Sequence, residues 1–250
     1  MRLILSTFRD GGGQLALKDI ATSMPGFRDF ERTLATVCGG QTREDKGVFD
    51  VLVPDAAGGL PFGISCKMTR FQPAVHQASF MELANSAAKF AAEFARLKLS
   101  WVHNPAMAGN AIVELVGGWH TALAGGVDAK RSQYLVLAHD TKWVNFQLLA
   151  FPLSLKLADP ATDVEWKVEG KGSSPSSVAG YIDGPGNRRH RLWQLYPNSG
   201  GQLKYYPPLE WATYTSPRFT LELPPVESLR ERADEYFPKL WAAAAGGATP

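Results

Sequence analysis

Apolar residues recur at the spacing of an α-helix in the segment that follows residue 26. Four of them lie three or four positions apart: Phe27, Phe30, Leu34 and Val37. This period places side chains on one face of a helix. Gly39 and Gly40 follow directly, and glycine commonly ends a helix because it adopts the left-handed conformation without strain. The pattern therefore predicts a helix that ends at this glycine pair.

Two β-rich runs come next, and a turn-like segment separates them. The runs are residues 47–54 and 60–68, and the segment between them reads Asp-Ala-Ala-Gly-Gly. This composition is typical of a β-hairpin, whose centre would lie between positions 57 and 58. Residues whose numbers sum to about 115 then lie opposite one another. Asp50 is therefore expected to face Ser65, with Lys67 on the same side of its strand as Ser65.

An alanine-rich segment from about Gln77 to Leu97 gives the strongest helix signal in the chain. Its apolar face comprises Phe80, Leu83, Ala87, Phe90 and Phe94. Shorter β-rich apolar runs at 111–116, 134–138 and 144–151 are expected to continue a central sheet. Together these elements predict an α/β fold with a mixed central sheet flanked by helices.

The chain changes character beyond Pro160, where loop-like segments rich in glycine, serine and proline surround short aromatic strands. We expect a core over residues 1–160 and a β-rich part over 161–250 that is integrated with it. A terminal helix is predicted over 225–241, and the tail at 242–250 is expected to fray.

Composition narrows the possible classes of protein. The chain has 250 residues, 45% of them hydrophobic, which suffices to bury a core. Its formal net charge at pH 7 is only +2, so any basic surface must be local. No apolar run reaches the ~18 residues needed to span a bilayer and no signal peptide is evident, so a cytoplasmic protein without a membrane partner is expected. Cys38 and Cys66 lack metal-ligand spacing, so neither a zinc site nor a disulfide framework is predicted.

The hairpin brings a carboxylate and an ammonium group together. Asp50 is suited to hold Mg²⁺ on a phosphate oxygen, and Lys67 to orient or help deprotonate the attacking water. The position for a second carboxylate, Ser65, carries no charge. Glu82 is the best candidate to replace it, because a charge within an otherwise apolar helical segment requires a partner, and Glu31 is a further candidate. In the structural alternative, Asp50 borders the hairpin while Lys67 and Glu82 lie on solvated faces.

This order of residues resembles the core of the PD-(D/E)xK nucleases, especially type II restriction endonucleases, over about residues 27–97. Most members carry acid-x-Lys on the second strand, whereas this chain has Ser65-Cys66-Lys67. A subgroup of restriction enzymes makes the same change, and a glutamate on the next helix then supplies the carboxylate. The resemblance implies a restriction-endonuclease-like fold in which Asp50 and Glu82 bind the metal. The neighbouring Asp55 is expected to be a turn residue.

One segment, residues 187–206, has the composition of a DNA-binding surface, because it contains basic, aromatic and amide side chains and no acid. The candidate DNA contacts are Asn187, Arg188, Arg189, Arg191, Gln202 and Lys204. The alternative is a solvated basic loop with Trp193, Tyr196 and Tyr205 in a minor core. His190 has no second ligand at metal-site spacing, so it is expected to be structural or to contact DNA.

These features predict a Mg²⁺-dependent, sequence-specific endonuclease acting on double-stranded DNA. Cutting both strands at a palindrome requires two centres related by a two-fold axis, so a homodimer is the expected assembly. Two alternatives stay open. One is a DNA-binding module without catalysis on a decayed nuclease scaffold, and the other is a DNA repair nuclease.

Overall fold

The computed structural model describes residues 1–2, 5, 15–16, 23–42, 48–71, 81–121, 126–141, 143–153, 164–171, 174–183 and 189–221. The chain divides into two compact units, one of residues 27–220 and one of residues 1–26 with 221–250. The second of these contains an antiparallel pair, β1 (Leu15–Ala16) and β2 (Ser23–Met24). The predicted terminal helix at 225–241 and the tail at 242–250 lie outside the described residues.

A seven-stranded sheet in the unit 27–220 has the order β13-β8-β7-β5-β4-β3, with β14 also paired to β8. Its strands are β3 (Gln41–Thr42), β4 (Val51–Val53), β5 (Phe62–Arg70), β7 (Gln133–His139), β8 (Asn145–Pro152), β13 (Tyr214–Thr215) and β14 (Phe219–Thr220). Strands β5 and β7 run parallel, whereas the other pairs are antiparallel. The predicted mixed sheet is thus confirmed, including strands at 134–138 and 144–151.

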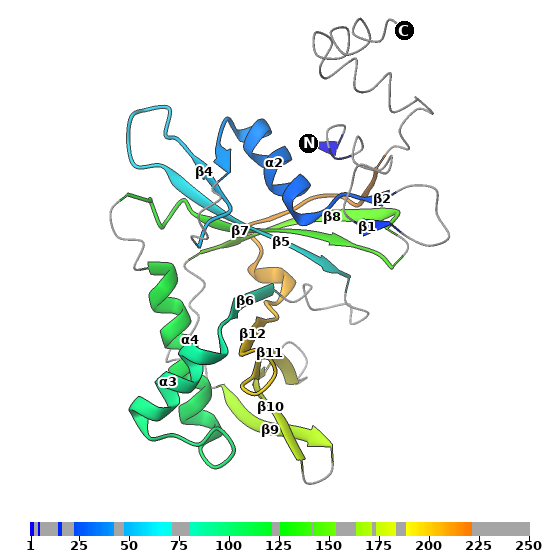
Figure 1. Cartoon of the computed structure of the whole chain (residues 1–250). Helices are drawn as coiled ribbons and strands as arrows, with labels where there is room; N and C mark the ends of the chain where they lie inside the picture. Colours follow the sequence, from blue (N-terminus) through cyan, green and yellow to red (C-terminus); the bar gives the residue numbers. More distant parts are fainter. Residues whose placement is uncertain are drawn as a thin grey trace, which may run out of the picture. The chain divides into compact units, whose positions relative to one another are not determined.

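Helix α2 (Phe27–Cys38) packs against β4 and β5 (Figure 1). Phe30 and Leu34 are buried, whereas Phe27 and Val37 are exposed, so the sequence located the helix but only half of its packed face. The helix ends as predicted, because Gly39 adopts a left-handed φ of 63°.

A second, five-stranded antiparallel sheet contains four strands of the β-rich C-terminal part and one strand from the earlier chain. Its order is β6-β12-β11-β10-β9. The strands are β6 (Met81–Asn85), β9 (Glu165–Lys171), β10 (Ser174–Asp183), β11 (Arg189–Tyr196) and β12 (Gln202–Tyr205). A short 3₁₀ helix, η2 (Leu209–Trp211), follows them.

The predicted helix over 77–97 is wrong in its first part, because residues 81–85 form β6 and α3 comprises only Ala87–Leu97. The segment at 81–85 pairs antiparallel with β12, and the backbone N–H of Ser86 donates to the carbonyl oxygen of Gly201 at 2.9 Å. Strand pairing with a distant segment therefore overrides the local helical composition. Phe90 and Phe94 are buried from α3, as its periodicity predicts.

The expected strand at 111–116 is also wrong, because this segment lies within α4 (Pro105–Thr121). A short apolar run fits a buried helix as well as a buried strand, and Pro105 stands at the first helical position, where proline is favoured. Helix α4 packs against β9, where the indole Nε1 of Trp166 donates to Asn110 Oδ1 at 2.9 Å. Among the described residues no helix is both long and apolar enough to cross a membrane.

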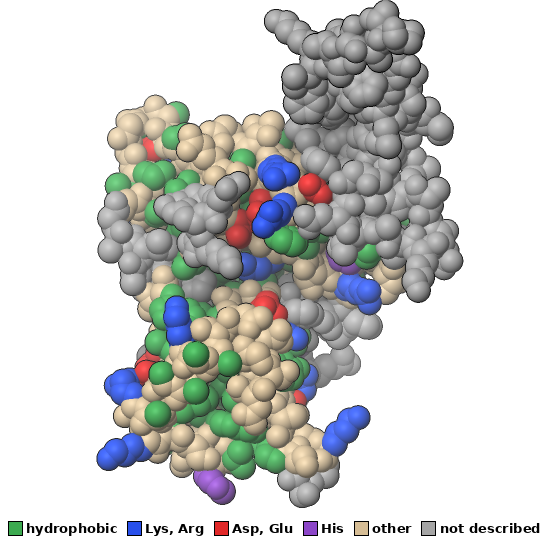
Figure 2. Space-filling model, in the orientation of Figure 1, with side chains coloured by type: hydrophobic (Ala, Val, Ile, Leu, Met, Phe, Trp, Pro, Cys, Tyr) green, Lys and Arg blue, Asp and Glu red, His purple; other side chains and the backbone are tan. Residues whose placement is uncertain are grey.

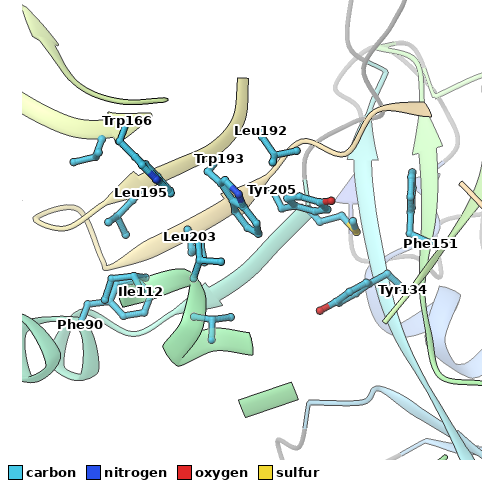
Figure 3. Packing of buried hydrophobic residues seen from close by; sticks show 14 of the residues in the cluster. Phe90, Ile112, Tyr134, Phe151, Trp166, Leu192, Trp193, Leu195, Leu203 and Tyr205 are labelled. Carbon is cyan, nitrogen blue, oxygen red and sulfur yellow. The ribbon is translucent and has the colours of Figure 1, made fainter. Parts of the chain in front are cut away.

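One large cluster of buried side chains joins members from both sheets of this unit and from α3 and α4. The rings of Trp193 and Tyr205 pack at a centroid distance of 4.4 Å, and Tyr134 of the seven-stranded sheet lies near Tyr205 (Figure 3). The two sheets are therefore held by a common core.

Candidate functional site

The β4–β5 hairpin has the register that the sequence predicts. Val51 lies opposite Ile64, Leu52 opposite Gly63 and Val53 opposite Phe62. The numbers of each pair sum to 115, which places Asp50 level with Ser65 just before β4 begins.

Asp50 extends the hydrogen-bond ladder of this hairpin, first through its backbone N–H and then through its side-chain carboxylate. Its N–H donates to the carbonyl oxygen of Ile64 at 3.0 Å. The next N–H along this edge of β5, that of Cys66, donates to Asp50 Oδ2 at 2.7 Å. The carboxylate thus accepts the bond that a backbone carbonyl would accept if the ladder continued. This arrangement fixes the carboxylate at the edge of β5, at the point where β4 begins.

Ser65 and Lys67 project from the same side of β5, because they are two residues apart on a strand. The hydroxyl of Ser65 donates to Asp50 Oδ2 at 3.3 Å, and Ser65 is only 1% exposed. A second buried carboxylate at this position would face Asp50 across the hairpin, so serine stabilises the arrangement as a hydrogen-bond donor. Lys67 is partly exposed.

Glu31 on α2 brings a second carboxylate to this place. Burial and the charge of Asp50 raise the pKa of Glu31 from 4.5 to about 7, against the opposing influence of Lys67, Arg28 and Arg32. Figure 2 shows acidic and basic side chains gathered over α2. The structure thus brings together four of the predicted residues: Asp50, Ser65, Lys67 and Glu31.

Cys66 lies among these charges but is not a nucleophile. Burial, and then the charges of Asp50 and Glu31, raise the pKa of the Cys66 thiol, so it stays protonated at neutral pH. Its contribution is the backbone N–H that binds Asp50.

The two carboxylates form a suitable pair for a hard divalent cation. A carboxyl group with a pKa near 7 beside an ionised partner would be stabilised by a positive charge between them. Mg²⁺ is commonly held through one or two carboxylates together with substrate phosphates. Over the described ranges, no group of three or more His, Cys, Asp or Glu side chains is placed to hold a metal ion. The chain's contribution at this site would therefore be the pair Asp50 and Glu31.

No protein-family model, curated protein or solved structure matches the chain. Any functional assignment consequently rests on the geometry of this site and on the chemistry of its residues.

Glu82 lies on a strand of the five-stranded sheet. The expectation that it belongs to a helix is wrong, because it lies on β6 in the five-stranded sheet, opposite Lys204 of β12. Asp50, Ser65 and Lys67 belong to the hairpin of the other sheet. Burial and the charge of Asp50 raise the pKa of the helical glutamate Glu31, and the role of Glu82 as a metal ligand stays a prediction.

Asp55 is a turn residue, as expected. Its carboxylate accepts the N–H of Gly59 at 3.1 Å and pairs with Arg131 at 3.2 Å. These hydrogen bonds lower the pKa of Asp55. Its role is to close the hairpin.

The predicted DNA-contact segment forms β11 and β12, and Trp193 and Tyr205 from it are buried in the core. Arg191 pairs with Glu169 at 2.8 Å, and Arg189 pairs with Glu165. Both arginines thus form ion pairs with glutamates of the same sheet. The structural alternative is confirmed for the two buried rings, while Asn187 and Arg188 lie outside the described residues.

Two other candidates in this segment are on β12. Lys204 Nζ lies 4.9 Å from the centroid of the Tyr196 ring, and Gln202 lies opposite Tyr196 in the ladder. Both side chains are partly exposed. Their contact with DNA stays a prediction.

The sequence reading missed Arg28 and Arg32. Both are exposed on α2, and both influence the pKa of Glu31. Their spacing of four residues, with Glu31 between them, was the available signal, because residues four apart share a helix face.

Proposed function

We propose that the chain is a Mg²⁺-dependent endonuclease of double-stranded DNA with a restriction-endonuclease-like core. The proposal is supported chiefly by one observation: the β4–β5 hairpin and α2 bring Asp50, Glu31 and Lys67 into one charged cluster. Two carboxylates and an ammonium group suit hydrolysis of a phosphodiester, whose transition state gathers negative charge.

Asp50 and Glu31 are the residues that would hold the cation. When bound, Mg²⁺ would polarise a phosphate oxygen and offset the charge that develops on the leaving oxygen. Ser65 and the Cys66 N–H hold Asp50 in place through its Oδ2 atom. Lys67, as an ammonium group, has only hydrogen-bond donors, so its role is to orient the attacking water or the phosphate. Arg28 and Arg32 offer further positive charge to neighbouring phosphates.

The experiment is a digest of a sequenced plasmid with Mg²⁺ and mapping of the fragment ends. We expect discrete fragments, and we expect Lys67→Ala to reduce their rate of formation by at least about 100-fold. Glu31→Gln should also reduce the rate, whereas Glu82→Gln should leave it within about threefold if Glu31 supplies the second carboxylate. Absence of fragments from many-site substrates, or fragments undiminished in Lys67→Ala, would refute the proposal.

A second candidate is a DNA-binding module that has lost catalysis, and Ser65 in place of a carboxylate favours it. This candidate predicts DNA binding without cleavage. It also predicts that Glu31→Gln leaves the DNA affinity in Mg²⁺ unchanged. A repair nuclease would instead prefer damaged or branched DNA over intact plasmid.

Cleavage of both strands would require two such centres, so the proposed assembly is a homodimer. Light scattering during size exclusion should give the mass of two chains plus one duplex for the complex with DNA. A single-chain mass on DNA that is cut in both strands would contradict this assembly.

A further inference from the structure

Strand β9 (Glu165–Lys171) is an open edge of the five-stranded sheet. The strand order places β10 on one side of β9, and among the described residues no strand pairs with its other side (Figure 1). Of its seven residues only Trp166 is buried, so the strand is accessible along its length. The outer N–H and C=O groups of an edge strand can pair with a strand of another chain.

A side-chain contact shows which backbone groups of β9 face this open edge. The hydroxyl of Ser176 on β10 donates to the carbonyl oxygen of Glu169 at 3.3 Å, so this carbonyl faces β10. Backbone groups of successive residues in an antiparallel strand point to alternate sides. The N–H and C=O groups of Trp166, Val168 and Gly170 therefore face the open edge.

The charges of β9 alternate in sign along one face of the strand. This face carries, in order, Glu165, Lys167, Glu169 and Lys171. The opposite face carries Trp166, which belongs to the core, and the partly exposed Val168. Charges on an edge strand commonly oppose pairing with another chain, but an alternating order of both signs can be complementary to itself.

We propose that β9 pairs antiparallel with β9 of a second copy of this chain, about a two-fold axis at Val168. Glu165 then lies opposite the partner subunit's Lys171. Lys167 lies opposite the partner's Glu169, so every charged pair is attractive. A centre at Lys167 would instead place Glu165 opposite the partner's Glu169, and a centre at Glu169 would place Lys167 opposite the partner's Lys171. Val168 is also the midpoint of β9, so this register alone pairs the whole strand.

The same register suits the backbone of the strand. Val168 lies opposite the partner's Val168, and Trp166 lies opposite the partner's Gly170. These residues have outward N–H and C=O groups, so they form the hydrogen-bonded pairs of the new ladder. The charged residues then occupy the non-hydrogen-bonded positions, where opposite side chains lie closer together. Two five-stranded sheets would thus join into one sheet of ten strands.

The carboxylates of this face are already held by their own sheet. Glu169 pairs with Arg191 at 2.8 Å, and Glu165 pairs with Arg189. Lys167 lies 3.0 Å from Glu165 on the same strand. Because both carboxylates are positioned before the second copy binds, little side-chain freedom is lost on pairing.

This interface would form the homodimer of the proposed function, and its role in cutting both DNA strands rests on that function. The pairing itself depends on β9 and requires neither DNA nor catalysis. It can therefore be measured on the full chain by itself.

Sedimentation of the full chain without DNA, over a series of concentrations, measures the dimer. We expect the wild type to dimerise. Lys171→Glu and Glu165→Lys should each raise the dissociation constant at least about tenfold, because each places like charges opposite one another at both ends of the ladder. An equimolar mixture of the two variants should restore the constant to within about threefold of the wild type, since the charges that meet are again opposite.

Val168→Pro tests the backbone pairing separately. It removes an N–H that faces the open edge, a position at which edge strands tolerate proline. The dimer should be lost while thermal unfolding of the monomer stays close to that of the wild type. Lys130→Glu makes the same change of charge as Lys171→Glu at an exposed lysine outside β9, and it should leave the dissociation constant unchanged.

A wild type that stays monomeric up to its solubility limit would overturn the inference, and so would a mixture of the two charge variants that fails to restore the dimer. Dimers retained by a folded Val168→Pro variant would do the same, and if this variant unfolds, the charge variants decide. If the wild type cuts plasmid DNA without pairing through β9, the interface is wrong and the nuclease proposal stands. If β9 dimers form in a chain that cuts nothing, the interface stands and the nuclease proposal fails.

Discussion

At the scale of single residues, the site depends on a carboxylate that replaces a backbone carbonyl. Asp50 Oδ2 accepts the Cys66 N–H at the edge of β5, and the register behind this contact followed from the sequence because a hairpin is a local structure. Glu31 was a weaker candidate, because its position beside Asp50 depends on how α2 packs against β4 and β5. Local pairing was therefore predictable, whereas the position of Glu31 beside Asp50 required tertiary structure.

Replacing Glu31 with glutamine should stabilise the fold above neutral pH. The pKa of Glu31 rises from 4.5 in an unperturbed chain to about 7 in the native state, so between these values the native state binds more protons than the unfolded state. The free energy of unfolding thus falls as the pH rises from 4.5 to about 7, and it has lost the full contribution of Glu31 above this range. After allowance for solvent screening, Glu31→Gln should raise the free energy of unfolding by about 1 kcal/mol at about pH 8 and by less at about pH 5.

Urea unfolding at the two pH values measures this difference. Glu93, a partly exposed glutamate of α3 that pairs with Arg96, provides the control. Glu93→Gln should give no gain at either pH, because it loses a favourable partner. A Glu31→Gln variant no more stable than the wild type at about pH 8 would contradict the electrostatic strain assigned to Glu31.

At the scale of elements, the predictions succeeded where the hydrophobic pattern and the residues that end an element or form a turn indicated the same boundaries. Helix α2 has both a helical period and a terminal glycine pair, and the hairpin has a turn sequence between its strands. The segment 81–85 failed because its partner, β12, is distant in the chain and converts alanine-rich sequence into strand. The prediction for the run 111–116 failed because a short apolar run fits a helix as well as a strand.

The junction of β12, β6 and α3 should tolerate no side chain at Gly201. This residue has φ 66°, and an added Cβ would lie 2.2 Å from the backbone nitrogen of Ala87. Gly58 has φ 78° but no atom within 4 Å of the added Cβ. Gly58→Ala should therefore cost about 1 kcal/mol for its backbone conformation alone, and Gly201→Ala at least about 3 kcal/mol. Equal losses in urea unfolding would show that the close approach at Gly201 is absent.

At the scale of the whole molecule, the unit 27–220 cannot be divided at residue 160 without breaking a sheet. Strand β6 precedes that position, whereas its partner β12 and the strands beyond it follow. A fragment of residues 1–160 would leave Met81 and Phe90 without the side chains of β11 and β12 that share their core. We expect this fragment to lack a cooperative unfolding transition by circular dichroism. A sharp transition would instead identify an independent domain.

Paired substitutions of the two hairpin aspartates test most directly which of them belongs to the proposed catalytic site. Asp50 and Asp55 flank β4, but Asp50 lies at the open edge of β5 and Asp55 closes the turn. Initial rates of plasmid cleavage in Mg²⁺ should fall at least about 100-fold in Asp50→Asn and stay within about threefold in Asp55→Asn, with both variants folded. Equal rates for the Asp50→Asn variant and the wild type, or a greater loss in Asp55→Asn, would contradict the account.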